Sequence, residues 1–141
     1  MNENKMDKTK PELGAGVVLD LPFDETMARA KAALKAEGFG VLTEIDVRET
    51  MKQKLDVDFR RYVILGACNP PLAHQALSAD LEVGLLLPCN VVVYDAGAGK
   101  TAVRIANPEA MSLMLDDPAF APIAAQAKEK LDRVAAALKE K

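Results

Sequence analysis

The run of four apolar or aromatic residues from Val91 to Tyr94 constrains the fold of this chain more than any other segment. Its continuous hydrophobicity is typical of a central strand that is covered on both faces or protected by a partner. A glycine-rich segment (DAGAGK, 95–100) follows, and residues 102–105 (AVRI) are again strand-like. These residues predict a β-hairpin deep in a sheet.

Three further strands are predicted upstream of this hairpin. Residues 17–21 alternate apolar with polar or small side chains, and residues 61–68 are rich in β-branched and aromatic side chains. In the segment 39–47, we expect the odd-numbered residues from 41 to 47 on one face and the even-numbered residues on the other.

Helices are predicted where a capping residue precedes an apolar stripe. Asp24 is the expected N-cap of a helix that ends at Gly38, and Asp46 is the expected N-cap of a two-turn helix. Asn69-Pro70, Asn107-Pro108 and Asp117-Pro118 combine a capping side chain with a proline that fits only the first turn, and the last opens a long C-terminal helix. Residues 81–87 are ambiguous between loop and strand.

The predicted order of elements is β-α-β-α-β-α-β-β-α-α. The short second helix and the hairpin do not supply the long crossovers that a parallel sheet requires. We therefore predict an α+β fold with a mainly antiparallel sheet of about five strands and helices mostly on one face. The 141 residues suit one core, so we expect a disordered charged tail at 1–12 and a single domain at 13–141.

The charge balance argues against two classes of partner. A formal net charge of −3 and a pI near 5.2 offer no basic surface for nucleic acid or for an anionic membrane. The most apolar stretch, 83–93, is too short to span a bilayer, and the N-terminus lacks the apolar core of a secretory signal. We expect a cytoplasmic protein whose two cysteines are reduced.

The two cysteines are the sharpest chemical feature, because each precedes an asparagine, in Cys68-Asn69 and in Cys89-Asn90. Cys68 ends one predicted strand and Cys89 begins another. If these strands pair antiparallel, the two thiols lie close enough for a shared site. If the strands are parallel, the thiols lie about 15–20 Å apart and a joint site is impossible.

Three interpretations of the cysteines remain open: small apolar residues in a packed sheet, a paired functional site, or one reactive thiol. Cys68 precedes the N-terminus of a predicted helix, where a thiolate is stabilised, whereas Cys89 begins an apolar strand. We therefore expect Cys68 to be the more acidic thiol.

Two other residues are weaker candidates for a ligand site. His74 is the only histidine and follows Cys68 on the predicted helix, but its position is typical of a solvent-facing residue. Arg48 could contact an anionic ligand together with Lys52, although a solvated helix face explains both. A soft metal such as Cu(I), bound by Cys68 and Cys89, is more plausible than a structural zinc, since the chain does not offer four obvious N or S ligands.

The functional hypothesis is a small-ligand or soft-metal binding module at the strand ends that carry Cys68, Asn69, Cys89 and Asn90, with His74 and Arg48 as further candidates. The asparagine amides would orient a polar group of the ligand. The alternatives are a thiol-dependent redox protein, in which Cys68 attacks and Cys89 resolves, and an interaction scaffold without pocket chemistry. No cofactor is required for folding at this chain length.

Three segments together resemble a known family: GFGVLTEIDV (38–47), LGACNPPLAHQAL (65–77) and LLPCNVVVYD (86–95). They are similar to the bacterial domain-of-unknown-function family numbered 302, over about residues 14–115. This resemblance implies a layered α+β domain of the TATA-binding-protein-like class and a homodimer. It implies no catalytic residues, because the family has no established activity.

Overall fold

The computed structural model describes residues 12–115 and 117–140, so most of the predicted tail, residues 1–11, lies outside the described residues. The elements follow the predicted order, with a short 3₁₀ helix added. In chain order they are β1 (Gly14–Leu19), α1 (Phe23–Ala36), β2 (Gly40–Asp46), α2 (Val47–Leu55), β3 (Tyr62–Cys68), α3 (Pro70–Ala79), η1 (Leu81–Leu86), β4 (Cys89–Gly97), β5 (Lys100–Ala106), α4 (Pro108–Ser112) and α5 (Phe120–Lys139).

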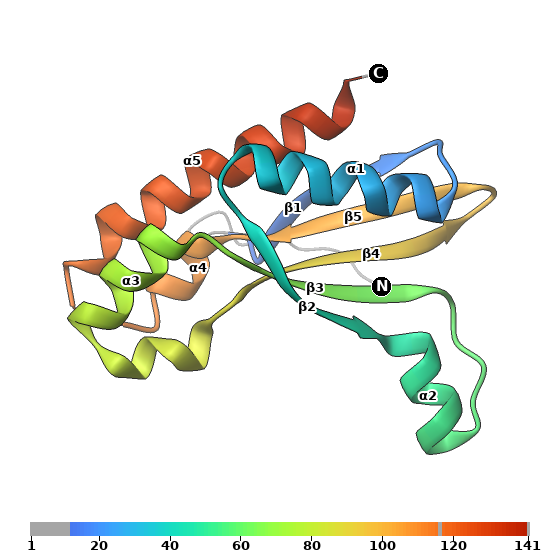
Figure 1. Ribbon diagram of the computed structural model, residues 1–141, viewed down its shortest axis with the longest axis horizontal. Helices are drawn as coiled ribbons and strands as arrows, with labels where there is room; N and C mark the ends of the chain where they lie inside the picture. The colour runs from blue at the N-terminus through green and yellow to red at the C-terminus, as the bar shows by residue number, and fades with distance from the viewer. Residues whose placement is uncertain (1–11, 116, 141) are drawn as a thin grey trace.

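The five strands form one sheet in the order β1-β5-β4-β3-β2, and every neighbouring pair is antiparallel. Helices α1 and α5 lie along the same face of this sheet, while α3, η1, α4 and the start of α5 gather at one end (Figure 1). The predicted α+β class and the antiparallel pairing of the two cysteine-bearing strands are therefore confirmed.

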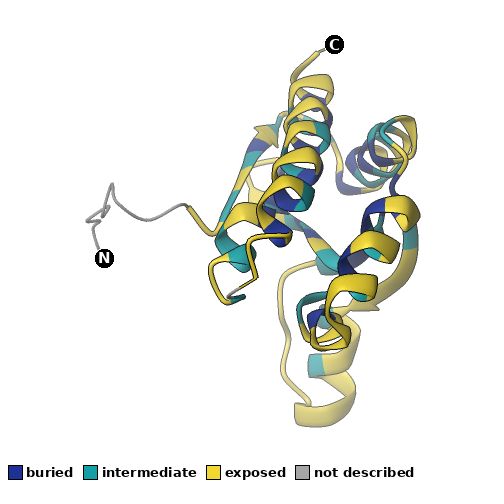
Figure 2. Ribbon diagram, turned by 90° about the vertical axis from the view of Figure 1, so that its left-hand side faces the viewer, coloured by how far each residue is buried: buried dark blue, intermediate teal, exposed yellow. Residues whose placement is uncertain are grey.

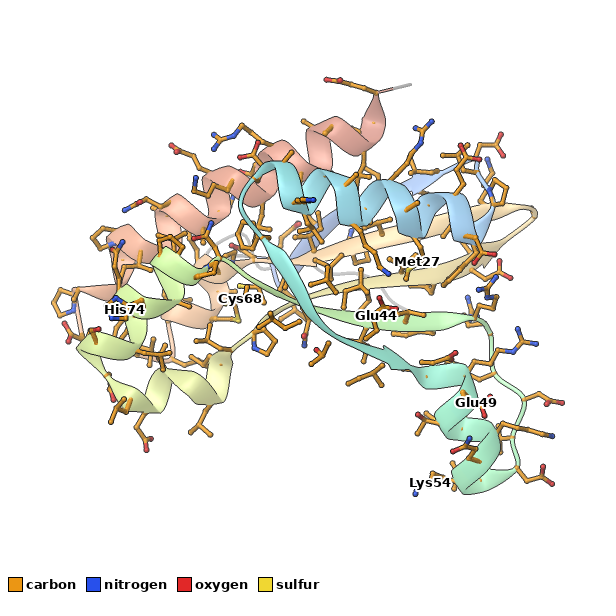
Figure 3. All side chains as sticks on the ribbon, in the orientation of Figure 1. Met27, Glu44, Glu49, Lys54, Cys68 and His74 are labelled. Carbon is orange, nitrogen blue, oxygen red and sulfur yellow. The ribbon has the colours of Figure 1, made fainter. Side chains whose placement is uncertain are left out.

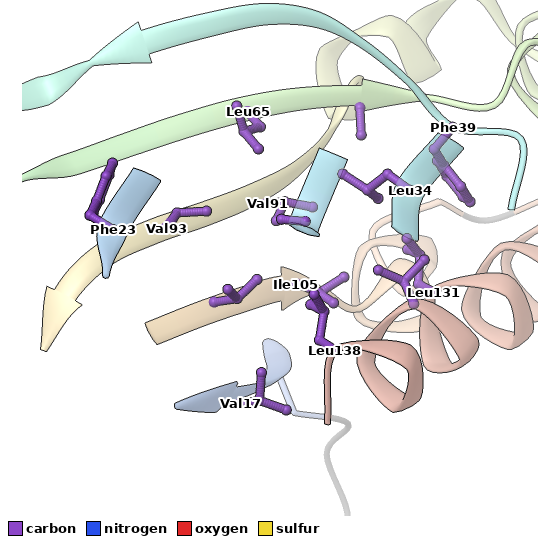
Figure 4. Packing of buried hydrophobic residues seen from close by; sticks show 14 residues of the cluster. Val17, Phe23, Leu34, Phe39, Leu65, Val91, Val93, Ile105, Leu131 and Leu138 are labelled. Atoms are coloured by element: carbon purple, nitrogen blue, oxygen red, sulfur yellow. The ribbon is translucent and has the colours of Figure 1, made fainter. Parts of the chain in front are cut away.

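The core lies between the sheet and the two long helices, where apolar side chains from both layers interdigitate (Figure 4). The strands contribute alternate residues to it, because successive side chains of a strand point to opposite faces. Its members include Val17, Phe23, Leu34, Phe39, Leu65, Val91, Val93, Ile105, Leu131 and Leu138. A second, smaller apolar cluster forms around Ala76, Val83 and Phe120 at the end where α3, η1 and α5 meet.

Helix caps follow the predicted residues with two exceptions. Gly38 has a φ of 83°, and the backbone N–H groups of Gly38 and Phe39 donate to the carbonyls of Lys35 and Leu34, which is a Schellman motif. The prediction that Asp24 is the N-cap of α1 is wrong. The helix begins at Phe23, and its N-cap Pro22 offers no side-chain hydrogen bond. The prediction that Asp117-Pro118 opens the C-terminal helix is also wrong, since α5 begins at Phe120 with Ala119 as its N-cap.

The predicted faces of β2 are wrong for part of the strand. The pairing shifts between Val41 and Thr43, so Val41 lies opposite Ala67 while Thr43 lies opposite Gly66. A β-bulge adds one residue to the strand and reverses the alternation beyond it. Val41 therefore packs against the core, whereas Thr43 faces the other side of the sheet.

Two other segments differ from the sequence expectation. Residues 81–86 form the 3₁₀ helix η1 rather than a loop or a strand, and the Asp80 carboxylate caps it by accepting from the N–H of Glu82. Strand β4 is central, but the two faces of its apolar run differ. Val91 and Val93 are buried in the core, while Val92 and Tyr94 are only half-buried on the opposite face.

Helix α2 and residues 56–61 form an arm that projects from the sheet and is exposed along almost its whole length (Figure 2). No residue of α2 is buried. Leu55, Val57 and Phe59 on this arm expose 64%, 45% and 40% of their surface. The apolar stripe of α2 is therefore only partly covered, since Val47 and Met51 are half-buried while Leu55 is exposed.

Candidate functional site

The two cysteines come together because β3 and β4 are antiparallel. Cys89, the first residue of β4, lies directly opposite Ala67, the neighbour of Cys68 at the end of β3. Both thiols are free and half-buried, and both line the same cavity. Cys68 lies where β3 turns into α3 (Figure 3).

This cavity has a volume of about 90 Å³ and is partly open to solvent. Its lining is almost wholly apolar and comes from every element at this end of the sheet. Helices α3, η1, α4 and α5 contribute Leu72, Ala73, Ala76, Val83, Leu86, Met111, Phe120, Ile123, Ala124 and Ala127, and the segment between α4 and α5 contributes Leu115. We call this space, bounded by Cys68, Cys89 and these residues, the thiol cavity.

Asn69 also lines the thiol cavity, but its side chain supports the fold. Its Oδ1 accepts a hydrogen bond from the N–H of Leu72 (3.2 Å), which caps α3, and its Nδ2 donates to the carbonyl of Glu37 (3.4 Å). The amide therefore ties the start of α3 to the end of α1. The expected N-cap role is confirmed, and little of the amide is left to orient a ligand.

The other candidate residues lie elsewhere. Asn90 follows Cys89 directly, so it points to the opposite face of the sheet and lines a different groove. His74 is exposed on α3 and is not part of the cavity wall. Arg48 is exposed on α2, beyond the end of β2 that is remote from Cys68. Of the six predicted residues, three line the thiol cavity: Cys68, Asn69 and Cys89.

Burial decides the chemistry of Cys89. Desolvation of the thiolate and, as a smaller effect, the nearby Cys68 together raise the pKa of Cys89 from 9.0 to about 11. At pH 7 the thiol is therefore neutral, and it acts as a small, polarisable apolar group.

The sequence hypothesis did not include the residues that close the cavity on its far side. Phe120, Ala124 and Ala127 lie on α5, about fifty residues after Asn69, and Met111 lies on α4. Phe120 and Ala127 belong to the apolar stripe of the C-terminal helix, but that pattern predicts only burial. Their role in a cavity depends on how α5 packs against α3, which local patterns do not encode.

Metal-ligating side chains do not gather at this site. Among residues 12–115 and 117–140, no three side chains of His, Cys, Asp or Glu are placed to hold one metal ion. The two thiols face a wall of hydrocarbon side chains, with the thioether of Met111 as the one further sulfur in the lining. The arrangement suits an uncharged, apolar guest.

These features define an α+β protein with a thiol-bearing apolar cavity at one end of an antiparallel sheet. The chain belongs to the family described as "Domain of unknown function DUF302", whose model matches residues 16–138.

A solved structure supports this assignment. The chain is similar to an uncharacterized conserved DUF302 protein from Bacillus stearothermophilus, with 35% sequence identity and a TM-score of 0.83. The similarity covers 92% of this chain and 100% of that one. No curated protein is detectably similar to the chain. In the described part of the chain, no helix combines the length and hydrophobicity needed to cross a bilayer.

Proposed function

We propose that this protein is a binding module for a small apolar molecule or apolar group, which enters the thiol cavity. The observation that carries the proposal is the convergence of two cysteine side chains and more than a dozen hydrocarbon side chains around one open cavity. A volume of about 90 Å³ suits a guest of a few heavy atoms, or the end of a longer molecule.

The raised pKa of Cys89 ranks the alternatives below this proposal. A redox cycle needs Cys89 to attack as a thiolate, yet with a pKa of about 11 only about one Cys89 in ten thousand is ionised at pH 7. A soft metal such as Cu(I) would first have to displace the same proton, so its binding would be strongly pH-dependent. An apolar guest needs no ionisation.

Xenon, a neutral probe of apolar cavities, tests the proposal. In a two-dimensional amide NMR spectrum under xenon pressure, we expect saturable shifts centred on Leu72, Cys89 and Phe120. The variant Ala124→Leu fills the cavity and should weaken this binding by tenfold or more. The matched variant Ala136→Leu adds the same atoms at an exposed position of the same helix and should leave the shifts unchanged.

Ser112→Leu provides a second filling variant at a half-buried position of the lining, in case Ala124→Leu does not fold. Equal xenon shifts in the parent protein and in a folded filling variant would contradict the proposal. So would shifts that do not saturate with pressure.

We also propose a homodimer in which the arm formed by α2 and residues 56–61 contacts a second copy. The arm exposes Leu55, Val57 and Phe59, and its flanking charges are of both signs, with Lys52 beside Asp56 and Asp58. A two-fold interface places the same patch on both sides, so a surface with balanced charges is complementary to itself. A reducing cytoplasm remains the proposed compartment, because it keeps two free thiols reduced.

A further inference from the structure

A groove larger than the thiol cavity lies on the opposite face of the sheet. Its volume is about 540 Å³, within the usual range for a small-molecule site. Its floor is formed by outward-facing residues of β3, β4 and β5, and its rim by η1, the segment before β4, and the start of β1. The lining includes Tyr62, Leu85, Leu87, Asn90, Val92 and Arg104. We call it the open-face groove.

Among the residues that the structure describes, Arg104 is the only charged one in the lining of this groove. It projects from β5 between Gly16 on β1 and Val92 on β4, which lie directly opposite it in the two neighbouring strands. Its guanidinium donates from Nη2 to the carbonyl of Gly14 (3.0 Å), which orients the side chain and leaves other N–H groups available. Gly16 has no side chain to cover it.

Asn90 supplies a second polar group beside Arg104. Asn90 lies on β4 two residues before Val92, the register partner of Arg104, so the two side chains are diagonal neighbours on one face. Such neighbours are about 7–8 Å apart at the backbone, a separation that long side chains span. An arginine fork and an amide donor together match the two oxygens of a carboxylate.

The rest of the groove is aliphatic or aromatic. Leu85 exposes 81% of its surface at the rim, and Leu87 and Val92 continue the apolar surface toward the floor. A small, strongly hydrated anion would leave this apolar surface exposed to water, whereas an alkyl chain would cover it. Charge and hydrophobicity therefore point to the same kind of occupant, one anionic end on an apolar body.

We propose that the open-face groove binds a small aliphatic carboxylate. Arg104 and Asn90 hold its carboxylate group, and Leu85, Leu87 and Val92 pack against its alkyl chain. This site goes beyond the function proposed for the thiol cavity. The two sites share Leu86, Leu87 and Met111 in their linings but use different polar groups on opposite faces of the sheet.

Octanoate and its neutral analogue octanol test the proposal by amide NMR titration. We expect octanoate to shift Tyr62, Asn90, Val92 and Arg104, and to bind at least tenfold more tightly than octanol. Arg104→Gln should weaken the binding of octanoate by tenfold or more and leave the binding of octanol unchanged. Arg104→Lys should retain part of the affinity for octanoate. Arg29→Gln removes one cation from α1 and is the control for net charge.

Each outcome decides between named sites. If the octanoate-induced shifts centre on Cys89 and Phe120, the alkyl chain of octanoate lies in the thiol cavity. That result would overturn the groove proposal and support the function proposed for the thiol cavity. Equal affinity of octanoate and octanol, or octanoate binding unchanged in folded Arg104→Gln, would also overturn it. Loss of xenon binding in the Ala124→Leu variant with octanoate binding intact would show that the two sites are independent.

Discussion

At the scale of single residues, the two cysteines show how similar sequence contexts lead to different places in the fold. Each is followed by asparagine, yet Asn69 is the N-cap of helix α3, whereas Asn90 is the second residue of strand β4. The thiol of Cys89 is desolvated in the cavity, and that is the main cause of its raised pKa.

The raised pKa of Cys89 predicts a pH dependence of stability. The folded-state pKa of Cys89 is about 11, above its ordinary value of 9.0, so the unfolded chain releases this proton first as pH rises. The contribution of Cys89 to the free energy of unfolding is therefore constant below about pH 8 and falls by about 1–3 kcal/mol between pH 9 and pH 11.

Chemical denaturation of the parent protein and of Cys89→Ala across this pH range measures the effect. The variant is less stable overall if the side chain packs well, but its stability should fall less steeply above pH 9. Parallel pH profiles for the two proteins would show that the thiol is not desolvated in the folded state.

At the scale of secondary-structure elements, Gly66 allows β2 and the segment before β4 to pack closely against β3. It lies on β3 opposite Thr43 and against Pro88, the residue before Cys89. A Cβ at this position would clash with the Thr43 hydroxyl and lie 2.8 Å from Pro88 Cγ. The close packing of three segments at Gly66 thus determines where β4 begins and where Cys89 points.

Replacing Gly66 with alanine should therefore destabilise the protein by about 1–3 kcal/mol, because Thr43 and Pro88 must both move. Gly40→Ala is the matched control, since a Cβ at Gly40 meets no atom within 4 Å. We expect thermal unfolding to show a lowered Tm for Gly66→Ala and a change of at most about 1 kcal/mol for Gly40→Ala. Equal stability of the two variants would mean that the segments around Gly66 are not tightly packed.

At the scale of the whole molecule, apolar surface is distributed unevenly. Helices α1 and α5 bury one face of the sheet, while the arm and the opposite face retain exposed apolar side chains such as Ile45 (48%) and Leu55 (64%). Large apolar patches on a soluble domain are typical of interfaces or ligand sites. We assign the arm to a second copy of the chain and the open-face groove to a ligand.

The dimer proposal predicts that a charge on the arm lowers the association. Leu55→Asp should weaken dimerisation by tenfold or more, whereas Leu81→Asp, at an even more exposed leucine on η1, should not. Light scattering and sedimentation over the micromolar range measure the mass. A monomer in the parent protein throughout this range, or equal masses for the two variants, would rule out the arm as the interface.

Local patterns were sufficient to predict most elements of this fold. The hairpin from β4 to β5, the glycine that ends α1 and the Asn69 cap all depend on interactions within a few residues, and the structure contains each of them. The antiparallel sheet was predicted from the short second helix and the hairpin, which do not supply the repeated long crossovers of a parallel sheet. The meeting of Cys68 and Cys89 is a consequence of that pairing.

Tertiary packing decided the features that the sequence left open or misassigned. The bulge in β2 reverses its faces after Val41, and the alternation of β4 separates Asn90 from Cys89. The far wall of the thiol cavity comes from α5, whose position depends on tertiary contacts such as those with α3 and α4. The apolar pattern of α5 alone does not determine these contacts. A sequence pattern records which side chains are apolar, but the space between them depends on how distant elements pack together.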